Sequence, residues 1–328
     1  MTGTPVANRP YDIWAQIYFL DKGQSLGEDF AEFKRNTDLS NKLGNNVEAR
    51  ESFESTVADI FTKISRFTVR ETKESCAIIL PKKVYESIYT SFEPIQYRMY
   101  RTVLREMAIE MKRDGDVVID DDSVALKRLL RLLQITSNPK LLHDAYTAIS
   151  GKEQQLESQL DEICSTGDKC IVWSNFIENI EQFFKKFHQY NPCKIHGSMS
   201  IEDRNASVDK FKMDQTCMVL FATPQAAKEG LTLTVANHVI FYDRGFNLDD
   251  YLQAQDRIHR ISQKKTCYIY NYIMQGSIDE WINKLIQAKH YAALLVQGDI
   301  PKEEYKHMAD YSYADIVREI LESGEALR

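Results

Sequence analysis

Residues 253–263, with the sequence QAQDRIHRISQ, carry side chains that could bind a polyphosphate. In a helix, a rotation of about 100° per residue would place Gln253, Arg257 and Arg260 on a narrow arc of one face. No glutamate stands four residues from either arginine, although Asp256 could pair with Arg260. Two guanidinium groups on one face can neutralise the charge that develops during phosphoryl transfer. A solvated basic helix face has the same spacing, so spacing alone leaves both interpretations open.

The region from about residue 150 must position these arginines, and it alternates strand and helix patterns. Apolar, β-branched runs predict five strands, at 169–173, 193–196, 217–222, 238–242 and 266–273. Strands that are apolar on both faces and alternate with helices indicate a parallel sheet with helices on both sides. The sequence therefore predicts an α/β fold here, preceded by a largely helical region.

In such sheets, ligands bind at the carboxyl ends of the strands. The residues just past the predicted strands are Ser174–Asn175, 196–204 (HGSMSIEDR), 222–233 (ATPQAAKEGLTL) and 243–247 (DRGFN). Their small, hydroxyl and amide side chains suit contacts to phosphate, but turns use the same residue types. Each loop alone is therefore weak evidence for a binding site.

The first half of the chain is predicted to be mostly helical. Residues 23–75 read as helices, another helix begins at Pro94, and an amphipathic helix at 126–139 is stopped by an Asn-Pro pair. A strand-like run at 78–89 is interrupted by a proline. The acidic stretch 114–122 lacks the glycine and terminal glutamate of a calcium loop, so we interpret it as a solvated loop and predict no metal site.

Composition limits the class of protein. A chain of 328 residues suggests two structural units, and 43% hydrophobic residues allow a packed core. The charge balance of 41 basic and 48 acidic residues gives 41 − 48 = −7, which argues against a histone-like binder. It leaves room for a local groove lined by a few Arg and Lys side chains.

The cysteines and the hydropathy pattern indicate an intracellular protein without a membrane partner. Six cysteines occur without a C-x-x-C pair, so we expect reduced, buried thiols that act as small hydrophobic residues in a reducing compartment. No apolar stretch of about 20 residues and no signal-peptide core are present. A cytoplasmic (nucleoid) location is favoured over a nuclear one, because long basic or acidic extensions are absent.

Several segments, in order along the chain, resemble motifs of the Swi/Snf-type DNA translocases of helicase superfamily two. In the first half of the chain, TGTPVAN (2–8) is similar to the third motif, and RFTVRETKE (66–74) is similar to the Arg-Arg-Thr-Lys segment. The segment LLRLLQITSNPKLL (129–142) is similar to the helix before the second lobe, KCIVWSNF (169–176) to motif four, and HGSMSIEDRNASVDKF (196–211) to the motif after it. The segments VLFATPQAAKEGLTLT, VIFYDRGFN and QAQDRIHRISQ are similar to motifs five and six. The resemblance implies a RecA-like second lobe and four regions. These are the end of a first lobe (1–22), a helical insertion and brace (23–140), the second lobe (141–295) and a helical tail (296–328).

The resemblance also assigns roles to residues. Arg257 and Arg260 match the arginine fingers that reach ATP held by the other lobe. Positions implied in binding nucleotide or coupling it to DNA are Gln253, Gly230, Glu229, Asp243 and Asn247. Positions implied near the DNA backbone are Ser174, Gly197, Ser198, Thr223 and Lys228, and those implied in coupling the lobes are Thr2, Gly3 and Thr4. The chain departs from the family pattern with Phe246 in place of tryptophan, and with Ala227 and Lys228 in place of a Gly-Gly pair.

Two motifs of ATP motors are not found in the sequence. The only Gly-Lys pair, Gly151–Lys152, is followed by Glu153, so it does not fit G-x-x-x-x-G-K-[ST], and no Asp-Glu-x-His box is present. We therefore expect ATP and Mg²⁺ to be held by a first lobe that lies outside this chain. That lobe and double-stranded DNA are the expected partners. The chain alone is expected not to hydrolyse ATP.

Other functions and roles stay open at this point. The chain could be a non-catalytic module that binds DNA or a partner protein, whereas RNA unwinding fits the motif arrangement less well. His196 and His259 have no nucleophile at a meaningful spacing, so we expect structural or backbone contacts from them. The three tryptophans, Trp14, Trp173 and Trp281, are expected in the core.

Overall fold

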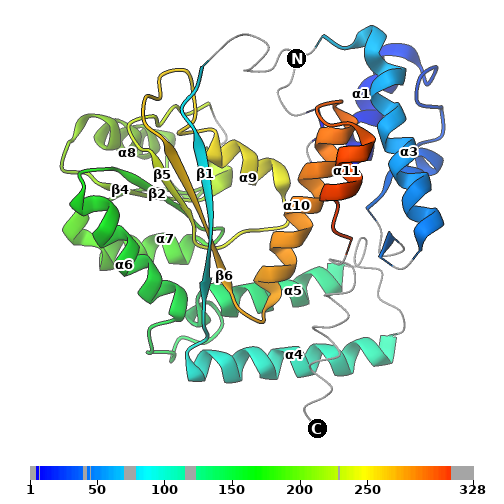
Figure 1. The fold of residues 1–328 in the computed structure, drawn as a ribbon. Helices are drawn as coiled ribbons and strands as arrows, with labels where there is room; N and C mark the ends of the chain where they lie inside the picture. The colour runs from blue at the N-terminus through cyan, green and yellow to red at the C-terminus, as the bar shows by residue number, and fades with distance from the viewer. Residues whose placement is uncertain are drawn as a thin grey trace. The chain divides into compact units, whose positions relative to one another are not determined.

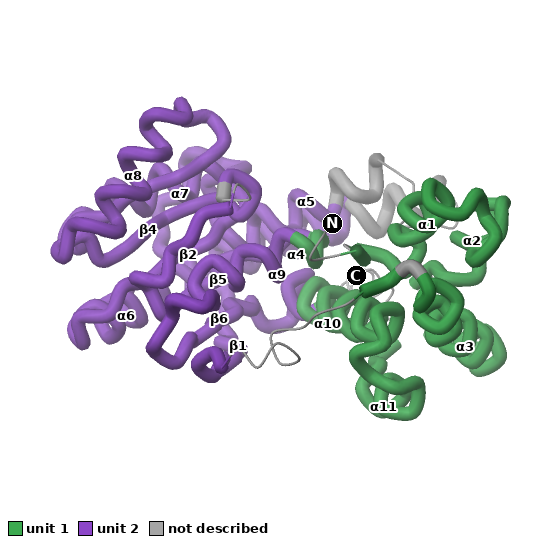
Figure 2. Tube along the Cα trace, turned by 90° about the horizontal axis from the view of Figure 1, so that it is seen from above, with its two compact units in different colours: residues 1–76, 246–249, 281–319 green, residues 77–245, 250–280, 320–328 purple. Residues whose placement is uncertain are grey.

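A computed structural model describes residues 5–6, 8–39, 43–44, 46–69, 79–114, 123–227 and 230–311. The chain divides into two compact units (Figure 2). Unit 1 combines residues 1–76, 246–249 and 281–319, and unit 2 combines residues 77–245, 250–280 and 320–328. None of the helices in the described ranges has the length and apolar character needed to cross a membrane.

Unit 2 is built on one parallel sheet of six strands (Figure 1). The strand order is β1-β6-β5-β2-β4-β3. The bounds are β1 Lys83–Thr90, β2 Cys170–Trp173, β3 Cys193–Ile195, β4 Val219–Ala222, β5 His238–Phe241 and β6 Cys267–Met274. All neighbouring pairs are parallel, which confirms the predicted α/β fold and the five strands predicted after residue 150.

Both faces of the sheet are covered because its strands alternate between two apolar clusters. On one face, Ile171 and Trp173 of β2 belong to a cluster that includes residues of helices α8 (Ile201–Met213) and α9 (Leu248–Gln255). On the other face, Cys170 and Val172 join a cluster with helices α6 (Gly151–Ser165) and α7 (Ile177–Lys186). Successive strand residues point to opposite faces, so every residue of β2 is buried.

The strand-like run at 78–89 forms β1, which lies at one edge of the sheet. It begins two residues after Pro81, which has no backbone N–H to donate. Its eight residues pair with all of β6, from Lys83↔Cys267 to Thr90↔Met274. Helices α4 (Pro94–Asp114) and α5 (Ser123–Ser137) follow it. The first strand of this sheet therefore comes from the region expected to be helical.

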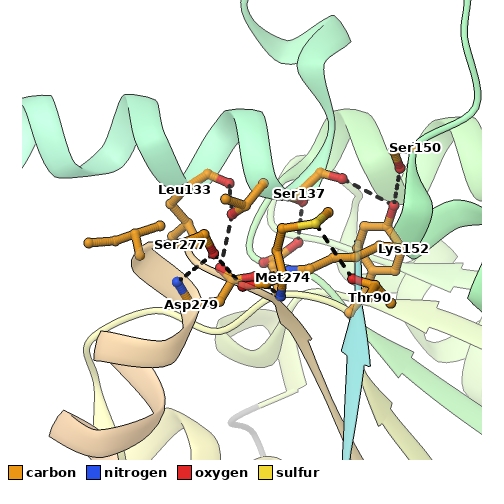
Figure 3. A network of polar contacts seen from close by, with 12 residues as sticks. Thr90, Leu133, Ser137, Ser150, Lys152, Met274, Ser277 and Asp279 are labelled. Carbon is orange, nitrogen blue, oxygen red and sulfur yellow. Dashed lines mark hydrogen bonds and ion pairs between the residues drawn. The ribbon is translucent and has the colours of Figure 1, made fainter. Parts of the chain in front are cut away.

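The Gly151–Lys152 pair begins helix α6 and carries a buried ion pair (Figure 3). Ser150 caps the helix by accepting a hydrogen bond from the Glu153 backbone N–H. Lys152 Nζ lies 2.6 Å from Asp279 Oδ2, with side-chain exposures of 0% and 5%. Asp279 also accepts hydrogen bonds from the Thr136 hydroxyl and the Met274 N–H, both at 2.9 Å. Lys152 therefore joins α6 to the start of α10 (Ile278–Val296).

Unit 1 is helical in its described part. It contains α1 (Trp14–Asp21), α2 (Phe30–Thr37), α3 (Val47–Ile64), α10 from Trp281, and α11 (Lys302–Met308). Helix α11 packs on α3, where the Tyr311 hydroxyl donates to Glu54 Oε1 at 3.0 Å. Gly298 has φ +71°, and a Cβ there would lie 2.7 Å from the Phe61 ring, so a glycine is needed at this approach. The start of the predicted tail thus belongs to the same unit as α3.

The predicted apolar and aromatic core positions are mostly buried. Ile13 and Ile17 of the N-terminal segment are buried, whereas Leu20 is 59% exposed. Trp173 and Trp281 are buried, as expected, whereas Trp14 is only half-buried. Helix α1 ends at Asp21, and the next residue, Lys22, adopts the left-handed conformation.

His238 at the start of β5 gives the fold a pH dependence. Its ring stacks on Tyr268 and Tyr270 of β6, at 4.9 and 5.9 Å between centroids, and burial lowers its pKa below the ordinary 6.5. The unfolded chain then takes up the proton first. The contribution of His238 to stability should be complete above about pH 6.5 and fall as the pH drops toward the lower pKa of the folded state.

The free energy of unfolding, measured by urea titration between pH 7.5 and 5, should fall less steeply in His238→Phe than in the wild type. His143→Gln, which changes an exposed histidine, is the control, and equal slopes for His238→Phe and wild type would contradict the prediction.

Candidate functional site

The carboxyl ends of four strands bring the predicted loops to one edge of the sheet. Backbone hydrogen bonds continue the ladder just past the strands, from Ser174 N–H to Ala222, from Thr223 N–H to Ile195 and from Tyr242 N–H to Trp173. The loops after β2, β3, β4 and β5 therefore begin side by side. This is the arrangement that the sequence predicted for a binding site.

Asp243, just past β5, is the centre of a buried polar cluster. Its carboxylate is 1% exposed and accepts hydrogen bonds only from neutral donors among the described residues. The donors are the Ser137 hydroxyl at 2.8 Å, the Ser174 hydroxyl at 2.6 Å, the Asn175 backbone and side-chain N–H groups at 2.7 and 2.9 Å, and the Asn179 amide at 3.4 Å. Such bonds offset the cost of burying a carboxylate. The cluster fixes the start of the 243–247 loop against β2, α5 and α7.

Ser174 differs from its predicted role at the DNA backbone. Its side chain is completely buried, donates to Asp243, and accepts from the Asn179 amide at 3.0 Å. A hydroxyl in this position cannot reach a phosphate from solvent. The side chain is buried because the residue after this strand points into the protein, and the role of Ser174 near the DNA backbone stays a prediction. Ser174 instead orients Asp243.

Sequence reasoning missed two members of this cluster, Ser137 and Asn179, and named Asn175 only as a residue of the loop after a strand. The signal available was a Ser-Asn pair at the end of two apolar elements, 137–138 and 174–175. Asn138 caps the turn after α5 and donates to the Asn179 side chain at 2.9 Å. A Ser-Asn pair at such an end can serve as a cap or turn, so its polar atoms need not face a ligand.

Gly197 and Ser198 lie in an exposed loop between β3 and α8. Ser200 caps α8 by accepting from the Asp203 N–H at 3.1 Å, and Arg204 Nε donates to the Met199 carbonyl at 3.2 Å. These hydrogen bonds fix the end of the loop that leads into α8, while Gly197 and Ser198 stay exposed. Thr223, past β4, is only 7% exposed, so it is less accessible than Gly197 and Ser198.

His196, at the end of β3, contacts a carboxylate behind this loop. Its Nε2 lies 2.9 Å from Glu181 Oε1, and Lys194 Nζ lies 2.6 Å from the same oxygen. Hydrogen bonds from Lys194, and then from His196, lower the pKa of Glu181. His259 contacts the Pro81 carbonyl at 2.8 Å. Both histidines make the structural or backbone contacts that were expected.

The arginine segment is not a continuous helix, which corrects the helical conformation considered for residues 253–263. Helix α9 ends at Gln255, and residues 256–262 form turns. The Arg257 carbonyl accepts a hydrogen bond from the distant Leu233 N–H at 2.9 Å. The Gln263 side chain donates to the Ile258 and Ala236 carbonyls at 3.0 and 2.8 Å. The common helix face proposed for Gln253, Arg257 and Arg260 is therefore wrong.

Arg260 is held at the surface of this turn by neutral oxygens. Its Nη1 donates to the Thr232 hydroxyl at 2.7 Å and to the Gly230 carbonyl at 3.2 Å, and its Nε donates to the Asp256 carbonyl at 3.1 Å. The Asp256 carboxylate, a predicted partner of Arg260, binds Lys83 Nζ at 2.8 Å. Gly230 has φ +61°, a conformation that other residues adopt only with strain. The half-buried guanidinium is thus oriented without neutralisation by any described carboxylate.

Arg257 and the glutamines of α9 have different surroundings. Arg257 is 5% exposed, whereas an arginine presented to an open cleft was expected. Gln253 is half-buried, and Gln255, which was not predicted, is 1% exposed and accepts from the Tyr85 hydroxyl at 2.9 Å. Of the two predicted arginine fingers, Arg260 is the more accessible.

Asn247 belongs to unit 1, where it contacts Asn8. The Asn8 amide donates to Asn247 Oδ1 at 3.0 Å, and Asn8 Oδ1 accepts from the Leu248 N–H at 2.7 Å. Phe246, which replaces the family's tryptophan, packs on Trp281 with 5.5 Å between ring centroids. The 2–8 segment and the end of the 243–247 loop are therefore joined directly.

Five predicted site residues lie outside the described residues. They are Thr2, Gly3, Thr4, Lys228 and Glu229. Residues 115–122 of the acidic stretch and residues 70–74 of the RFTVRETKE segment also lie outside them. Their roles stay predictions. Within the described ranges, no group of three His, Cys, Asp or Glu side chains could hold a metal ion.

Two family models match consecutive parts of the chain. The SNF2-related domain matches residues 1–141, and the helicase conserved C-terminal domain matches residues 152–262. Together they leave out only a short join and the C-terminal part. This supports the resemblance stated from the motifs.

Curated relatives match over nearly the whole chain. The DNA repair and recombination protein RAD54-like from Gallus gallus is 26% identical over 93% of this chain and 45% of its own length. The putative ATP-dependent helicase/translocase YwqA from Bacillus subtilis is 27% identical over 88% of this chain and 31% of its own. The chain therefore spans less than half the length of these relatives.

Solved structures of archaeal proteins share the fold. The Sulfolobus solfataricus SWI2/SNF2 ATPase core in complex with double-stranded DNA has a TM-score of 0.55 and 26% identity, over 91% of this chain and 64% of that one. The C-terminal domain of the Sulfolobus solfataricus SWI2/SNF2 ATPase has a TM-score of 0.52 and 21% identity, over 70% of this chain and all of that one. The second match bears on the fold alone, and it agrees with a RecA-like lobe.

Proposed function

Because this chain belongs to the Swi/Snf family of helicase superfamily two, we propose that it is the part of an ATP-dependent translocase that supplies an arginine finger and contacts double-stranded DNA. The two family matches, over 1–141 and 152–262, support the class of enzyme. The archaeal relative whose structure contains double-stranded DNA supports duplex DNA as the track.

The observation that carries this proposal is the environment of Arg260. Its guanidinium contacts three neutral oxygens and remains half-exposed in the turn after α9. A cation that is oriented but not neutralised by described residues can approach a phosphate from another lobe. Arginine is suited to this role because its planar donors match phosphate oxygens.

The residues of this chain then have distinct tasks. Arg260 stabilises the charge that develops on the transferred phosphoryl group. The Asp243 cluster fixes the loop that leads into α9 and the arginine turn. The exposed Gly197–Ser198 loop contacts the DNA backbone, so closing the two lobes over ATP shifts this half along the duplex. ATP and Mg²⁺ are held by the other lobe, where Mg²⁺ neutralises phosphate charge.

The dependence of duplex DNA binding on salt concentration tests the proposed contact with DNA. The 328-residue chain should bind a fluorescent duplex with an affinity that falls by roughly 0.9 log unit per phosphate contacted for each log unit of salt. Ser198→Asp should weaken binding about tenfold, because it places a carboxylate beside the phosphates. Ser165→Asp, at the exposed end of α6, should bind like the wild type. A flat salt response would contradict the DNA track and favour a module that docks on a protein.

ATP turnover by the 328-residue chain alone tests the proposal that the other lobe holds ATP and Mg²⁺. We expect no DNA-stimulated phosphate release above background from the 328-residue chain. The reason is that its only Gly-Lys pair is committed to the buried Lys152–Asp279 ion pair. Steady-state phosphate release with and without duplex DNA measures this. Robust DNA-stimulated hydrolysis, retained after purification to homogeneity, would contradict the proposal.

A further inference from the structure

Two buried cysteines, Cys193 and Cys217, lie against each other in unit 2. Their sulfur atoms are 3.2 Å apart, and the side chains are 3% and 0% exposed. The other buried cysteines in the described ranges have carbonyl neighbours instead, since Cys170 and Cys267 lie 3.7 and 3.8 Å from backbone oxygens. The expectation that all cysteines act only as small hydrophobic residues does not account for this pair.

The pair sits at the edge of the sheet, where local opening is least costly. Cys193 begins β3, an edge strand of three residues that pairs only with β4. Cys217 precedes β4, and the two cysteines are separated by 24 positions. A short edge strand has few ladder hydrogen bonds to break, so it opens more readily than the central strands. A small oxidant can therefore reach Cys193 without global unfolding.

Two ammonium groups, of Lys210 and Lys169, lie close to the pair and act to lower the pKa of both thiols. The hydrogen bond from Cys217 lowers the pKa of Cys193, and the Lys210 and Lys169 ammonium groups lower it further. Lys210 Nζ lies 3.3 Å from the Pro192 carbonyl, next to Cys193, and Lys169 Nζ lies 2.7 Å from the Asp214 carbonyl. The hydrogen bond to Cys193 and burial raise the pKa of Cys217. Because Cys193 begins the short edge strand, it is assigned as the attacking thiolate, and Cys217 as the resolving thiol.

We propose that Cys193 and Cys217 are a reversible redox site, which a hydroperoxide converts into a disulfide that ties β3 to the chain entering β4. The disulfide would enclose α8 and the exposed Gly197–Ser198 loop, because both lie between the two cysteines. This redox proposal does not depend on the proposed function.

The chemistry is balanced with the peroxide as oxidant. The Cys193 thiolate attacks one peroxide oxygen, so an S–O bond forms, the O–O bond breaks, and the alcohol or water leaves with a proton. The Cys217 thiol then loses its proton and attacks the sulfenic sulfur, which forms the S–S bond and releases water. Two thiols and one hydroperoxide thus give a disulfide, water and the reduced peroxide.

Peptide mapping of the 328-residue chain tests the site. Trypsin cleaves after Lys194, Arg204, Lys210 and Lys212, so Cys193 and Cys217 leave in separate peptides unless a disulfide joins them. After brief exposure to hydrogen peroxide and alkylation of free thiols, the joined peptide should appear. The Tm should rise by roughly 5–10 °C, and dithiothreitol should reverse both changes.

Matched variants separate this pair from other cysteines. Cys217→Ser should lose the joined peptide and the rise in Tm, whereas Cys267→Ser, another buried cysteine, should keep both. The wild-type peptide map decides the matter even if Cys217→Ser folds poorly. Loss of the Cys193 thiol without the joined peptide, or pairing of Cys193 with a different cysteine, would overturn the proposal.

Discussion

Replacing Arg260 with alanine should lower DNA-stimulated ATP turnover by about 10³–10⁵-fold and leave ATP binding nearly unchanged. The measurement needs a protein that joins this chain to a lobe with a phosphate loop. The large effect follows because the guanidinium would act on charge that appears only in the transition state. Its ground-state partners are the Thr232 hydroxyl and two carbonyls, so its loss removes little from the folded protein.

Two further variants make this test specific. Arg260→Lys keeps the charge but loses the planar fork of donors, so it should recover only a small part of the activity. Arg131→Ala, which removes an exposed arginine from α5, should turn over ATP like the wild type. Turnover by Arg260→Ala within threefold of the wild type, with intact DNA binding, would rule out the arginine finger at this position.

Lys152→Ala should destabilise the fold by about 3–5 kcal/mol, because it leaves the Asp279 carboxylate buried without its cation. Among the residues that the structure describes, Asp279 would then keep the Thr136 hydroxyl and the Met274 N–H as donors. The ion pair links α6 to α10, so its loss affects elements far apart in the sequence. Urea unfolding followed by tryptophan fluorescence measures the change.

The controls for this prediction separate burial from charge. Lys265→Ala removes a lysine that is 64% exposed and pairs with Asp168, so it should cost about 1 kcal/mol or less. The double variant Lys152→Met with Asp279→Leu should recover much of the lost stability, since neither charge is then left unpaired. A Lys152→Ala protein as stable as Lys265→Ala would contradict the assignment of Lys152 to a buried ion pair.

The sheet could be predicted from the sequence because its strands are visible as local runs of apolar, β-branched residues. The runs at 169–173 and 238–242 are apolar after their first residue, which fits strands buried on both faces, and both formed as expected. The run at 78–89 also carried a strand signal, but its place beside β6 depends on a pairing with residues 267–274 that local sequence does not encode. Topology of this kind comes from tertiary contacts.

The site was harder to predict because distant groups decide where its side chains point. The apolar spacing of Ile258 and Ile261 continues a helical pattern past Gln255, yet the helix ends there and the Arg257 carbonyl accepts from the distant Leu233 N–H. Ser174 follows a strand, as a phosphate contact would, but Asp243 draws its hydroxyl inward. In both cases, a partner more than 20 positions away competes with the local pattern.

The placement of β1 beside β6 has a consequence for synthesis on the ribosome. Thr90 and Met274 are partners 184 positions apart. At about 5–20 residues per second, roughly 10–40 s pass after β1 is made before its neighbour is translated. During that interval, a strand carrying Tyr85 and Tyr89 has no sheet to join. Nascent chains are therefore most exposed to aggregation at this stage, and slower translation beyond residue 90 would prolong it.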